Sequence, residues 1–280
     1  MRNSSHRLTE CDRRKMLDMY VAGESSGALA ASFGVSATAV CALMRRRGVS
    51  ARSPRDRHKR CSLDERAFDN WTPAAAYWAG FLFADGSVDR SRRSITLRLA
   101  ARDGAHVARF RDFLGSSHSI TVVEGWRQRG TDGHQLSIRS PSLVARLSNA
   151  GMTAGCPRRA CPDLAASRDF WRGVVDGDGH VAIRENAARL ELVGNRDLLD
   201  QFLAFVCRHA PGCRATVRPH KSIFRVGLRG KYASVILATL YTEAVQALPR
   251  KVAVAHNAAL NVLARGLRAV PAETLAIASF

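Results

Sequence analysis

The sequence is short of acidic residues. Its 280 residues include 24 Asp and Glu against 43 Lys and Arg, and the formal net charge is +19 with a pI near 10.9. Only five of the basic residues are lysines, and the arginines are spread along the whole chain. A genomic bias toward arginine would explain the choice of Arg over Lys, but it would not explain the missing acids. A folded chain this basic most often binds nucleic acid, through its phosphates.

Long hydrophobic runs and a regular cysteine framework are also missing. The apolar runs in the two segments described next are about 11 residues or shorter, well below the roughly 20 that span a bilayer. The seven cysteines are odd in number, and none shows the two-residue spacing typical of zinc knuckles. No signal peptide is recognisable. We therefore expect a cytoplasmic protein, not secreted and without a membrane role, with reduced thiols.

Two short segments nearly repeat each other. Residues 77–86 read YWAGFLFADG and residues 170–179 read FWRGVVDGDG, so that the terminal aspartates, Asp85 and Asp178, lie 93 residues apart. A single Asp-Gly is usually just a turn. Two copies with matching aromatic, Gly and Asp-Gly positions at a domain-scale interval favour an internal duplication instead.

Each segment is expected to form a helix with small residues four apart. Gly80 with Ala84, and Gly173 with Gly177, would lie on one helix face each. Without bulky side chains on that face, a second backbone can approach closely. We therefore predict that the two helices pack on each other inside a soluble core.

The two aspartates are then predicted at helix C-termini, each followed by a glycine suited to a C′ position. A carboxylate at that end faces the negative pole of the helix dipole. Two carboxylates brought together by close packing also repel each other. A divalent cation between Asp85 and Asp178 removes both penalties, and oxygen ligands shared with a phosphate suit Mg²⁺.

At these residues the sequence resembles the LAGLIDADG homing endonucleases, in the single-chain form with two motif copies. The resemblance implies an α+β fold: a duplicated αββαββα unit with two pseudo-symmetric halves and saddle-shaped β-sheets. It also implies that Asp85 and Asp178 hold catalytic Mg²⁺, one per active site, with Mn²⁺ able to substitute. An upstream acidic position of the motif, not the metal ligand, is Phe83 in the first copy and Asp176 in the second.

The organisation along the chain agrees with such a duplication. Helices are expected in both motif segments and after the first strands of each half. We expect a helix-turn-helix domain in 1–47, a basic linker in 48–71, repeats in 72–163 and 164–267, and a tail in 268–280. Strands are predicted at 94–99, 119–126 and 134–139 in the first repeat, and at 180–183, 189–193, 216–218 and 223–228 in the second.

The N-terminal segment reads as three short helices, the last one capped by Ser36. This pattern is typical of a helix-turn-helix, in which the third helix enters the major groove. Small protein-binding bundles look similar, but the arginine-rich linker that follows favours DNA. The residues expected near base edges are Ser36, Ala37 and Thr38, and those expected at phosphates are Arg45, Arg46 and Arg47.

Basic residues are also predicted on the outward faces of both sheets. A two-stranded ribbon fits the major groove, and most such contacts position the protein rather than read bases. The candidates are Arg98, Arg127, Arg129 and Arg139 in the first repeat, and Arg184, Arg189, Arg218, Lys221 and Arg225 in the second.

A further match links residues 157–159 (PRR) to residues 249–251 (PRK), 92 positions apart. By resemblance, a basic residue late in each repeat orients water or stabilises the transition state. Lys251 fits this role, whereas Arg159 in the first copy is a poor proton handler, which raises the prospect of one weakened site that only nicks. The alternative is that both are ordinary surface residues.

We therefore expect a monomeric, site-specific endonuclease of double-stranded DNA. The main rival is a DNA-binding transcriptional regulator that uses the same scaffold without cutting, and Arg159 favours it slightly. A splicing helper that binds intron RNA is less natural, because A-form RNA hides its major groove.

Overall fold

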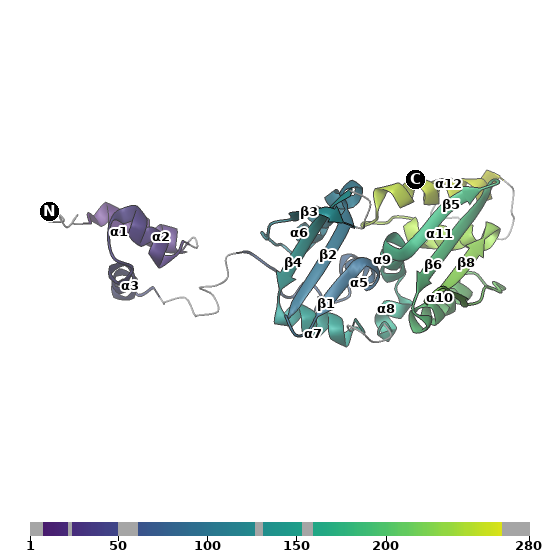
Figure 1. Cartoon of the computed structure of the whole chain (residues 1–280), viewed down its shortest axis with the longest axis horizontal. Coiled ribbons are helices and arrows are strands. Elements are labelled where there is room, and N and C mark those ends of the chain that lie inside the picture. The colour runs from purple at the N-terminus through teal and green to yellow at the C-terminus, as the bar shows by residue number, and fades with distance from the viewer. Residues whose placement is uncertain (1–7, 22–23, 50–60, 127–130, 153–158, 265–280) are drawn as a thin grey trace. The chain divides into compact units, whose positions relative to one another are not determined.

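The computed structural model divides the chain into two compact units, Met1–Ser62 and Leu63–Phe280 (Figure 1). It describes residues 8–21, 24–49, 61–126, 131–152 and 159–264. The second unit begins before the predicted start at 72. Phe68 is buried in its core, and the Asp64 N–H donates to the Leu114 carbonyl at 2.8 Å. Across the described ranges, no single helix is long and apolar enough to cross a membrane.

In the described part of the first unit the three predicted helices, α1 (Glu10–Val21), α2 (Ser26–Phe33) and α3 (Ala37–Arg46), surround a small core. The Ser36 side chain accepts from the Ala39 N–H at 3.1 Å and starts α3 as expected. Gly34 takes the left-handed conformation (φ 64°) in the tight turn before it. The chain bends by 108° between α2 and α3, within the ~90–120° of helix-turn-helix motifs. Whether this unit binds DNA stays a prediction.

The first repeat contains a four-stranded antiparallel sheet in the order β1-β2-β4-β3. Its β2 alternates as predicted, with Ile95, Leu97 and Leu99 in the core and Thr96 and Arg98 on the other face. Strand β1 was not predicted. The elements are α5 (Pro73–Asp85), β1 (Gly86–Asp89), β2 (Ser94–Ala100), η1 (Ala101–Asp103), α6 (Gly104–Phe113), β3 (Thr121–Trp126), β4 (Thr131–Arg139) and α7 (Pro141–Asn149).

The second repeat has the same topology, with the sheet order β5-β6-β8-β7. This confirms the duplicated αββαββα fold. The short strand β7 lies two residues later than predicted. The elements are α8 (Pro162–Ala166), α9 (Arg168–Asp178), β5 (Gly179–Arg184), β6 (Ala187–Gly194), α10 (Arg196–His209), β7 (Arg218–His220), β8 (Ile223–Arg229), α11 (Gly230–Tyr241) and α12 (Pro249–Ala264).

Helices α5 and α9 pack on each other through the predicted small residues (Figure 1). A Cβ added to Gly80 would lie 2.0 Å from the Phe170 carbonyl oxygen, and one added to Gly173 would lie 2.1 Å from the Tyr77 carbonyl oxygen. A Cβ on Gly177 would lie 2.3 Å from that of Ala84. The two backbones therefore touch, and no larger side chain fits between them.

The glycines that follow the two motif aspartates have a different role from the one predicted. Gly86 (φ −89°) and Gly179 (φ −82°) are extended, not left-handed, so the C′ interpretation is wrong. A Cβ on Gly86 would meet the Leu82 carbonyl oxygen at 2.6 Å, and one on Gly179 would meet the Val175 carbonyl oxygen at 2.5 Å. Glycine is needed because each chain leaves its helix by folding tightly over the last turn.

Candidate active site and nucleic-acid interface

Asp85 and Asp178 are the last residues of α5 and α9, as predicted. Both side chains are half-buried. The carboxylate of Asp85 lies against the last turn of the opposite helix, since a Cβ on Gly177 would be 3.4 Å from Asp85 Oδ2. The close packing of α5 and α9 therefore brings the two carboxylates to neighbouring helix ends, where the helix dipoles are negative.

This pair of carboxylates fits a hard cation better than a soft one. Among the described residues, no group of three or more His, Cys, Asp or Glu side chains could hold a metal ion. Zinc sites need such a set of nitrogen and sulfur ligands. Mg²⁺ instead is often held by one or two carboxylates, with waters and substrate phosphates completing the shell. The donor set of Asp85 and Asp178 suits the second case.

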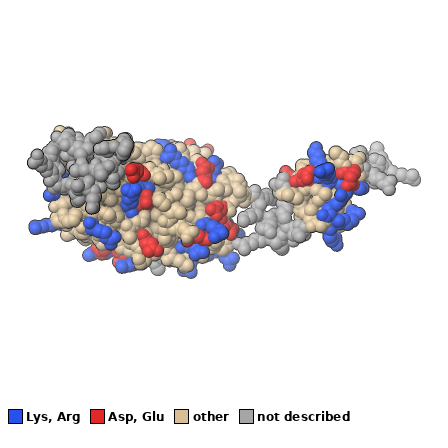
Figure 2. Space-filling view, turned by 180° about the vertical axis from the view of Figure 1, so that it is seen from behind, with Lys and Arg blue, Asp and Glu red and all other residues tan. Residues whose placement is uncertain are grey.

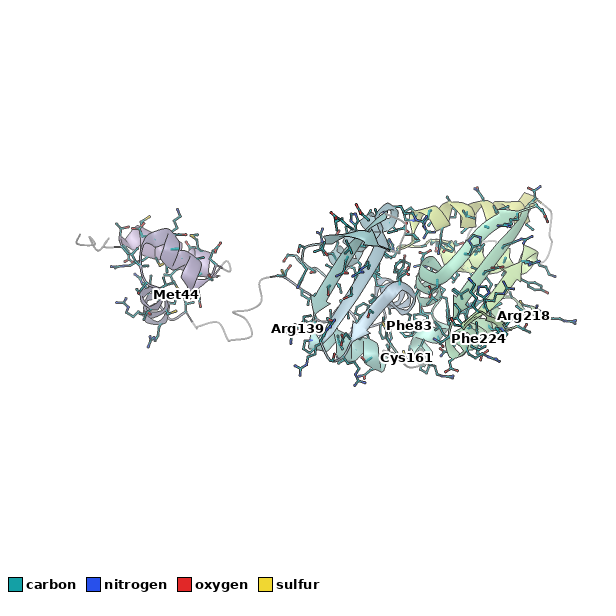
Figure 3. All side chains as sticks on the ribbon, viewed as in Figure 1. Met44, Phe83, Arg139, Cys161, Arg218 and Phe224 are labelled. Carbon is teal, nitrogen blue, oxygen red and sulfur yellow. The ribbon has the colours of Figure 1, made fainter. Side chains whose placement is uncertain are left out.

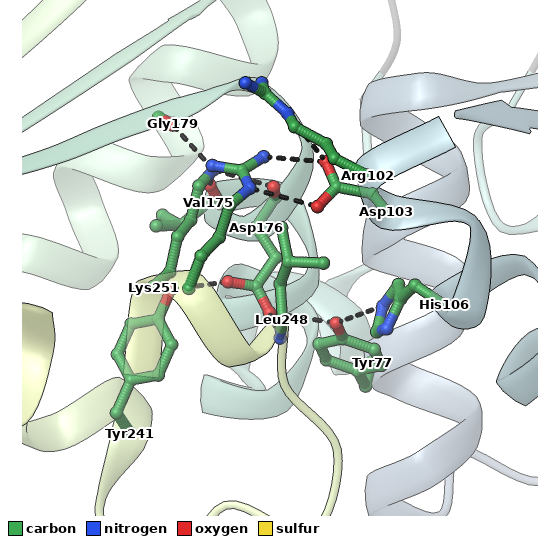
Figure 4. Close-up of polar contacts among 11 residues, drawn as sticks. Tyr77, Arg102, Asp103, His106, Val175, Asp176, Gly179, Tyr241, Leu248 and Lys251 are labelled. Carbon is green, nitrogen blue, oxygen red and sulfur yellow. Dashed lines mark hydrogen bonds and ion pairs between the residues drawn. The ribbon is translucent and has the colours of Figure 1, made fainter. Parts of the chain in front are cut away.

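Lys251, near the start of α12, is buried with 4% of its surface exposed. Its Nζ donates to three carbonyl oxygens, those of Val175, Asp176 and Gly179, each at 2.6 Å (Figure 4). Burial lowers the pKa of Lys251 to about 8, against the opposing effect of Asp176, Asp85 and Asp178. The ammonium thus caps the negative end of α9 and fixes the turn that carries Asp178.

Asp176 is the centre of a buried polar cluster between the repeats (Figure 4). Its carboxylate accepts from Tyr77 Oη at 2.8 Å, from Tyr241 Oη at 2.6 Å and from the Leu248 N–H at 2.7 Å. Burial raises the pKa of Asp176, while these donors and Lys251 oppose the rise. The cluster joins α5 and α11 to the segment before α12, and so it holds the start of the helix that carries Lys251.

Two further residues extend this cluster. His106 Nε2 lies 2.7 Å from Tyr77 Oη. Because the Tyr77 hydroxyl has one proton and gives it to Asp176, His106 donates from Nε2. Its Nδ1 is buried without a partner among the described residues, and burial lowers the pKa of His106 to about 4. On the other side, the guanidinium of the fully buried Arg172 lies over the Tyr77 ring, 5.3 Å from its centre, and donates to the Leu240 and Gln246 carbonyls and to Asp169.

The equivalent contact in the other half is apolar. By the motif interval of 93 residues, Tyr77 corresponds to Phe170 and Asp176 corresponds to Phe83. The rings of Phe83 and Phe170 meet edge to face, with centroids 5.2 Å apart. One half of the helix interface is therefore polar and charged, and the other half is aromatic. None of the cluster partners Tyr77, His106, Arg172 or Tyr241 was predicted. Alignment of the two motifs does show that Tyr77 stands opposite Phe170 and that Asp176 stands opposite Phe83.

Comparison with solved structures identifies the architecture. A homing endonuclease, I-WcaI, solved bound to its DNA recognition sequence, matches with a TM-score of 0.50 and 10% identity, over 67% of this chain and 91% of that chain. I-GzeII, a LAGLIDADG homing endonuclease in complex with its DNA target, matches at 0.47 and 12%, over 74% and 97%. Full-length DUF199/WhiA from Thermatoga maritima matches at 0.44 and 14%, over 76% and 69%.

The chain has the LAGLIDADG homing endonuclease fold. No protein-family model matches the sequence, and no curated protein does. At these identities the likeness establishes the fold alone. The arrangement of the site within the LAGLIDADG fold must therefore be argued from this chain's own residues.

Within the LAGLIDADG fold, Arg159 is not placed like Lys251. Its side chain is exposed, and its carbonyl oxygen is packed against Gly151, where a Cβ would lie only 1.7 Å away. The residue that precedes Lys251 by the motif interval of 93 is Arg158, which lies outside the described residues. A catalytic role of Arg159 stays a prediction.

Those of the predicted basic residues that the structure describes lie on the non-core faces of the LAGLIDADG sheets or in their turns; Arg139 and Arg218 are labelled in Figure 3. Arg98 is half-buried and donates from Nε to Gln135 at 2.6 Å across the β2–β4 pair, while Arg139 is exposed. Arg127 and Arg129 lie outside the described residues. In the second repeat Arg189 is half-buried, and the exposed residues are Arg184, Arg218, Lys221 and Arg225.

One basic residue of the second sheet was missed. Arg229 pairs with Arg189 across the β6–β8 ladder and is exposed. The strand was predicted to end at 228, one residue early. Extending the alternation of exposed and buried positions from Arg225 by four residues would have placed Arg229 on the exposed face.

The residues predicted to contact DNA in the first unit are at the surface. Ser36, Ala37 and Thr38 begin α3 and are exposed, and Arg45 and Arg46 are exposed in its last turn. On the face shown in Figure 2, Lys and Arg are interspersed with Asp and Glu rather than gathered in one area.

Proposed function

We propose that this protein is a site-specific endonuclease of double-stranded DNA, that it depends on Mg²⁺, which Mn²⁺ can replace, and that it acts as a monomer. The observation that carries the proposal is the pair of half-buried carboxylates, Asp85 and Asp178, at the ends of two helices in backbone contact. A monomer supplies both halves, because each repeat of the single chain contributes one helix and one sheet.

In this proposal Asp85 and Asp178 hold the divalent cation. When bound, such an ion polarises the phosphate and lowers the pKa of a coordinated water. The protein's own task is to keep the carboxylates in place. Lys251 does this at Asp178 by holding the carbonyls of the turn around it. The arginines of both sheets offer phosphate contacts along a duplex.

The first unit adds a second DNA contact in this proposal. The capped start of α3 presents Ser36, Ala37 and Thr38 on an exposed turn, in the manner of a recognition helix. Arg45 and Arg46 would bind phosphates. This unit would lengthen the recognised site beyond the part contacted by the two sheets.

A regulator that binds DNA without cutting is the second candidate. One observation favours it: all three N–H groups of Lys251 are occupied by carbonyl oxygens. Lys251 in this state has no N–H left to donate to a leaving group. The endonuclease proposal therefore assigns Lys251 to positioning and electrostatics, and not to proton transfer.

The test is cleavage of a randomised supercoiled plasmid library by the full chain with Mg²⁺, Ca²⁺ or EDTA, followed by sequencing of all broken ends. Linear product at a recurring site with Mg²⁺ alone is the expected result. Nicked circles alone would indicate a single live site. Retention of one specific sequence without breakage would overturn the endonuclease proposal in favour of the regulator.

A further inference from the structure

A hollow of about 520 Å³ opens beside the sheet of the second repeat. Its lining contains four arginines, which come from β7, from β8 and from the loop before β7. All four arginines are exposed at the surface. The charged lining residues are Arg214, Arg218, Arg225, Arg229 and, as the single acid, Glu191.

Glu191 stands in the middle strand pair of the sheet. It lies on β6 between the buried Leu190 and Leu192, so its side chain is on the face turned away from the core. Its cross-strand neighbours are His180 on β5 and Gly227 on β8. A Cβ on Gly227 would be 3.8 Å from Glu191 Cγ. Glycine at this position leaves the space beside the Glu191 side chain open.

The carboxylate of Glu191 forms no hydrogen bond or ion pair with any residue that the structure describes, although four arginines line the same hollow. Glu185, at the tip of the same hairpin, does approach Arg189 at 4.0 Å. Glu191 is thus a half-buried acceptor, on a face whose other charged groups in the hollow are all positive.

A carboxylate on a DNA-facing surface has a specific cost. It repels every phosphate near it and weakens binding to all sequences alike. A carboxylate can only accept hydrogen bonds, so it binds favourably to a base that presents a hydrogen-bond donor in the major groove. Cytosine does so through its N4 amino group, and Glu and Asp are the side chains that accept from it.

We infer that Glu191 is a specificity-determining residue that accepts a hydrogen bond from the N4 amino group of a cytosine in the half-site contacted by the second repeat. The inference rests on the proposed binding of double-stranded DNA. The surrounding arginines hold the backbone on both sides of that base pair, and Gly227 gives its edge room to approach the carboxylate. Thymine and guanine present only acceptors at the corresponding place, and adenine places its N7 acceptor beside its amino group, so that all three are disfavoured against cytosine.

The experiment selects binding sites from random double-stranded DNA with the full chain in Ca²⁺, for the wild type and for Glu191→Gln, Glu191→Ala and Glu185→Gln. The wild type should require cytosine at one position of the selected site. Glu191→Ala should lose about 5- to 150-fold of discrimination there and nowhere else, and Glu191→Gln should shift the preference toward adenine. Glu185→Gln removes one charge from the same hairpin and should leave that position unchanged.

Two results overturn the inference, and they are distinguishable. If all variants select the same site and Glu191→Ala merely binds every sequence more tightly, the carboxylate only lowers the affinity for DNA in general and does not recognise a base. If the wild type selects no sequence at all, the DNA-binding proposal falls together with the inference.

Discussion

Tyr77 donates a 2.8 Å hydrogen bond to Asp176 across the pair of central helices, whereas the corresponding residues of the opposite halves, Phe170 and Phe83, meet edge to face. The same contact thus exists in a polar and an apolar version. In the polar version, Asp176 also accepts hydrogen bonds from Tyr241 and from the segment before α12. One side of the interface between α5 and α9 is therefore held by hydrogen bonds to a buried carboxylate, and the other side by contact between two aromatic rings.

Tyr77→Phe should destabilise the second unit. It removes a donor from a buried carboxylate and the acceptor of His106, and leaving such a group unpaired costs about 1–3 kcal/mol. The midpoint of urea unfolding measures this. Tyr232→Phe is the matched control, since its hydroxyl bonds the exposed Gly212 carbonyl at 2.9 Å and should shift stability by less than about 0.5 kcal/mol. Equal effects of the two variants would contradict the role given to Asp176.

Gly80→Ala should also destabilise the second unit, although alanine is the better helix former. The new methyl group would lie 2.0 Å from the Phe170 carbonyl oxygen, which belongs to backbone and cannot rotate away. Such overpacking costs about 1–3 kcal/mol or more, against a gain of about 1 kcal/mol from helix propensity. Gly194→Ala is the control, because its methyl would meet only Leu199 at 3.9 Å. A Gly80→Ala protein as stable as Gly194→Ala would refute the backbone contact.

Acid should weaken the fold through His106. Its pKa is about 4 in the folded chain against 6.5 for an ordinary histidine, so between these values the unfolded chain binds a proton that the folded chain excludes. Stability is therefore lost as the pH falls from 6.5 toward 4, by about 3 kcal/mol at the lower end. His106→Gln keeps an N–H donor and does not titrate. The difference in unfolding free energy between wild type and His106→Gln should change with pH by that amount; a constant difference would show that His106 is not held neutral.

Lys251→Met should slow the cutting of one strand more than the other. The variant loses the three bonds to the turn around Asp178, and a small misplacement of a reacting group costs up to about 100-fold in rate. The strand affected should be the one that Asp178 serves, with little change in DNA binding. The ratio of the two strand rates is unaffected by partial unfolding. Lys231→Met, which removes an exposed lysine, should leave that ratio unchanged, and equal slowing of both strands by Lys251→Met would argue against a positioning role.

Much of the fold was predictable because its signals are local. The Asp-Gly motifs, the small residues four apart and the alternation of β2 each follow from a few neighbouring residues. Strand β1, with four residues, is too short to show a period. The polar cluster was not predictable, because Tyr77, Asp176 and Tyr241 come from three separate helices and look apolar or ordinary one at a time. The role of Gly86 and Gly179 was misjudged, because their close contact with the preceding helical turn depends on the three-dimensional path of the chain and cannot be read from the residue types.

The most direct test of the central claim follows the two DNA strands separately. A target plasmid labelled on either strand is incubated with wild type, Asp85→Asn and Asp178→Asn in Mg²⁺, and binding is measured in parallel. We predict that each variant binds like the wild type and nicks a single strand, and that the two variants leave opposite strands intact. Double-strand cleavage by either variant at the wild-type rate would contradict the assignment of these two aspartates as the metal-binding residues.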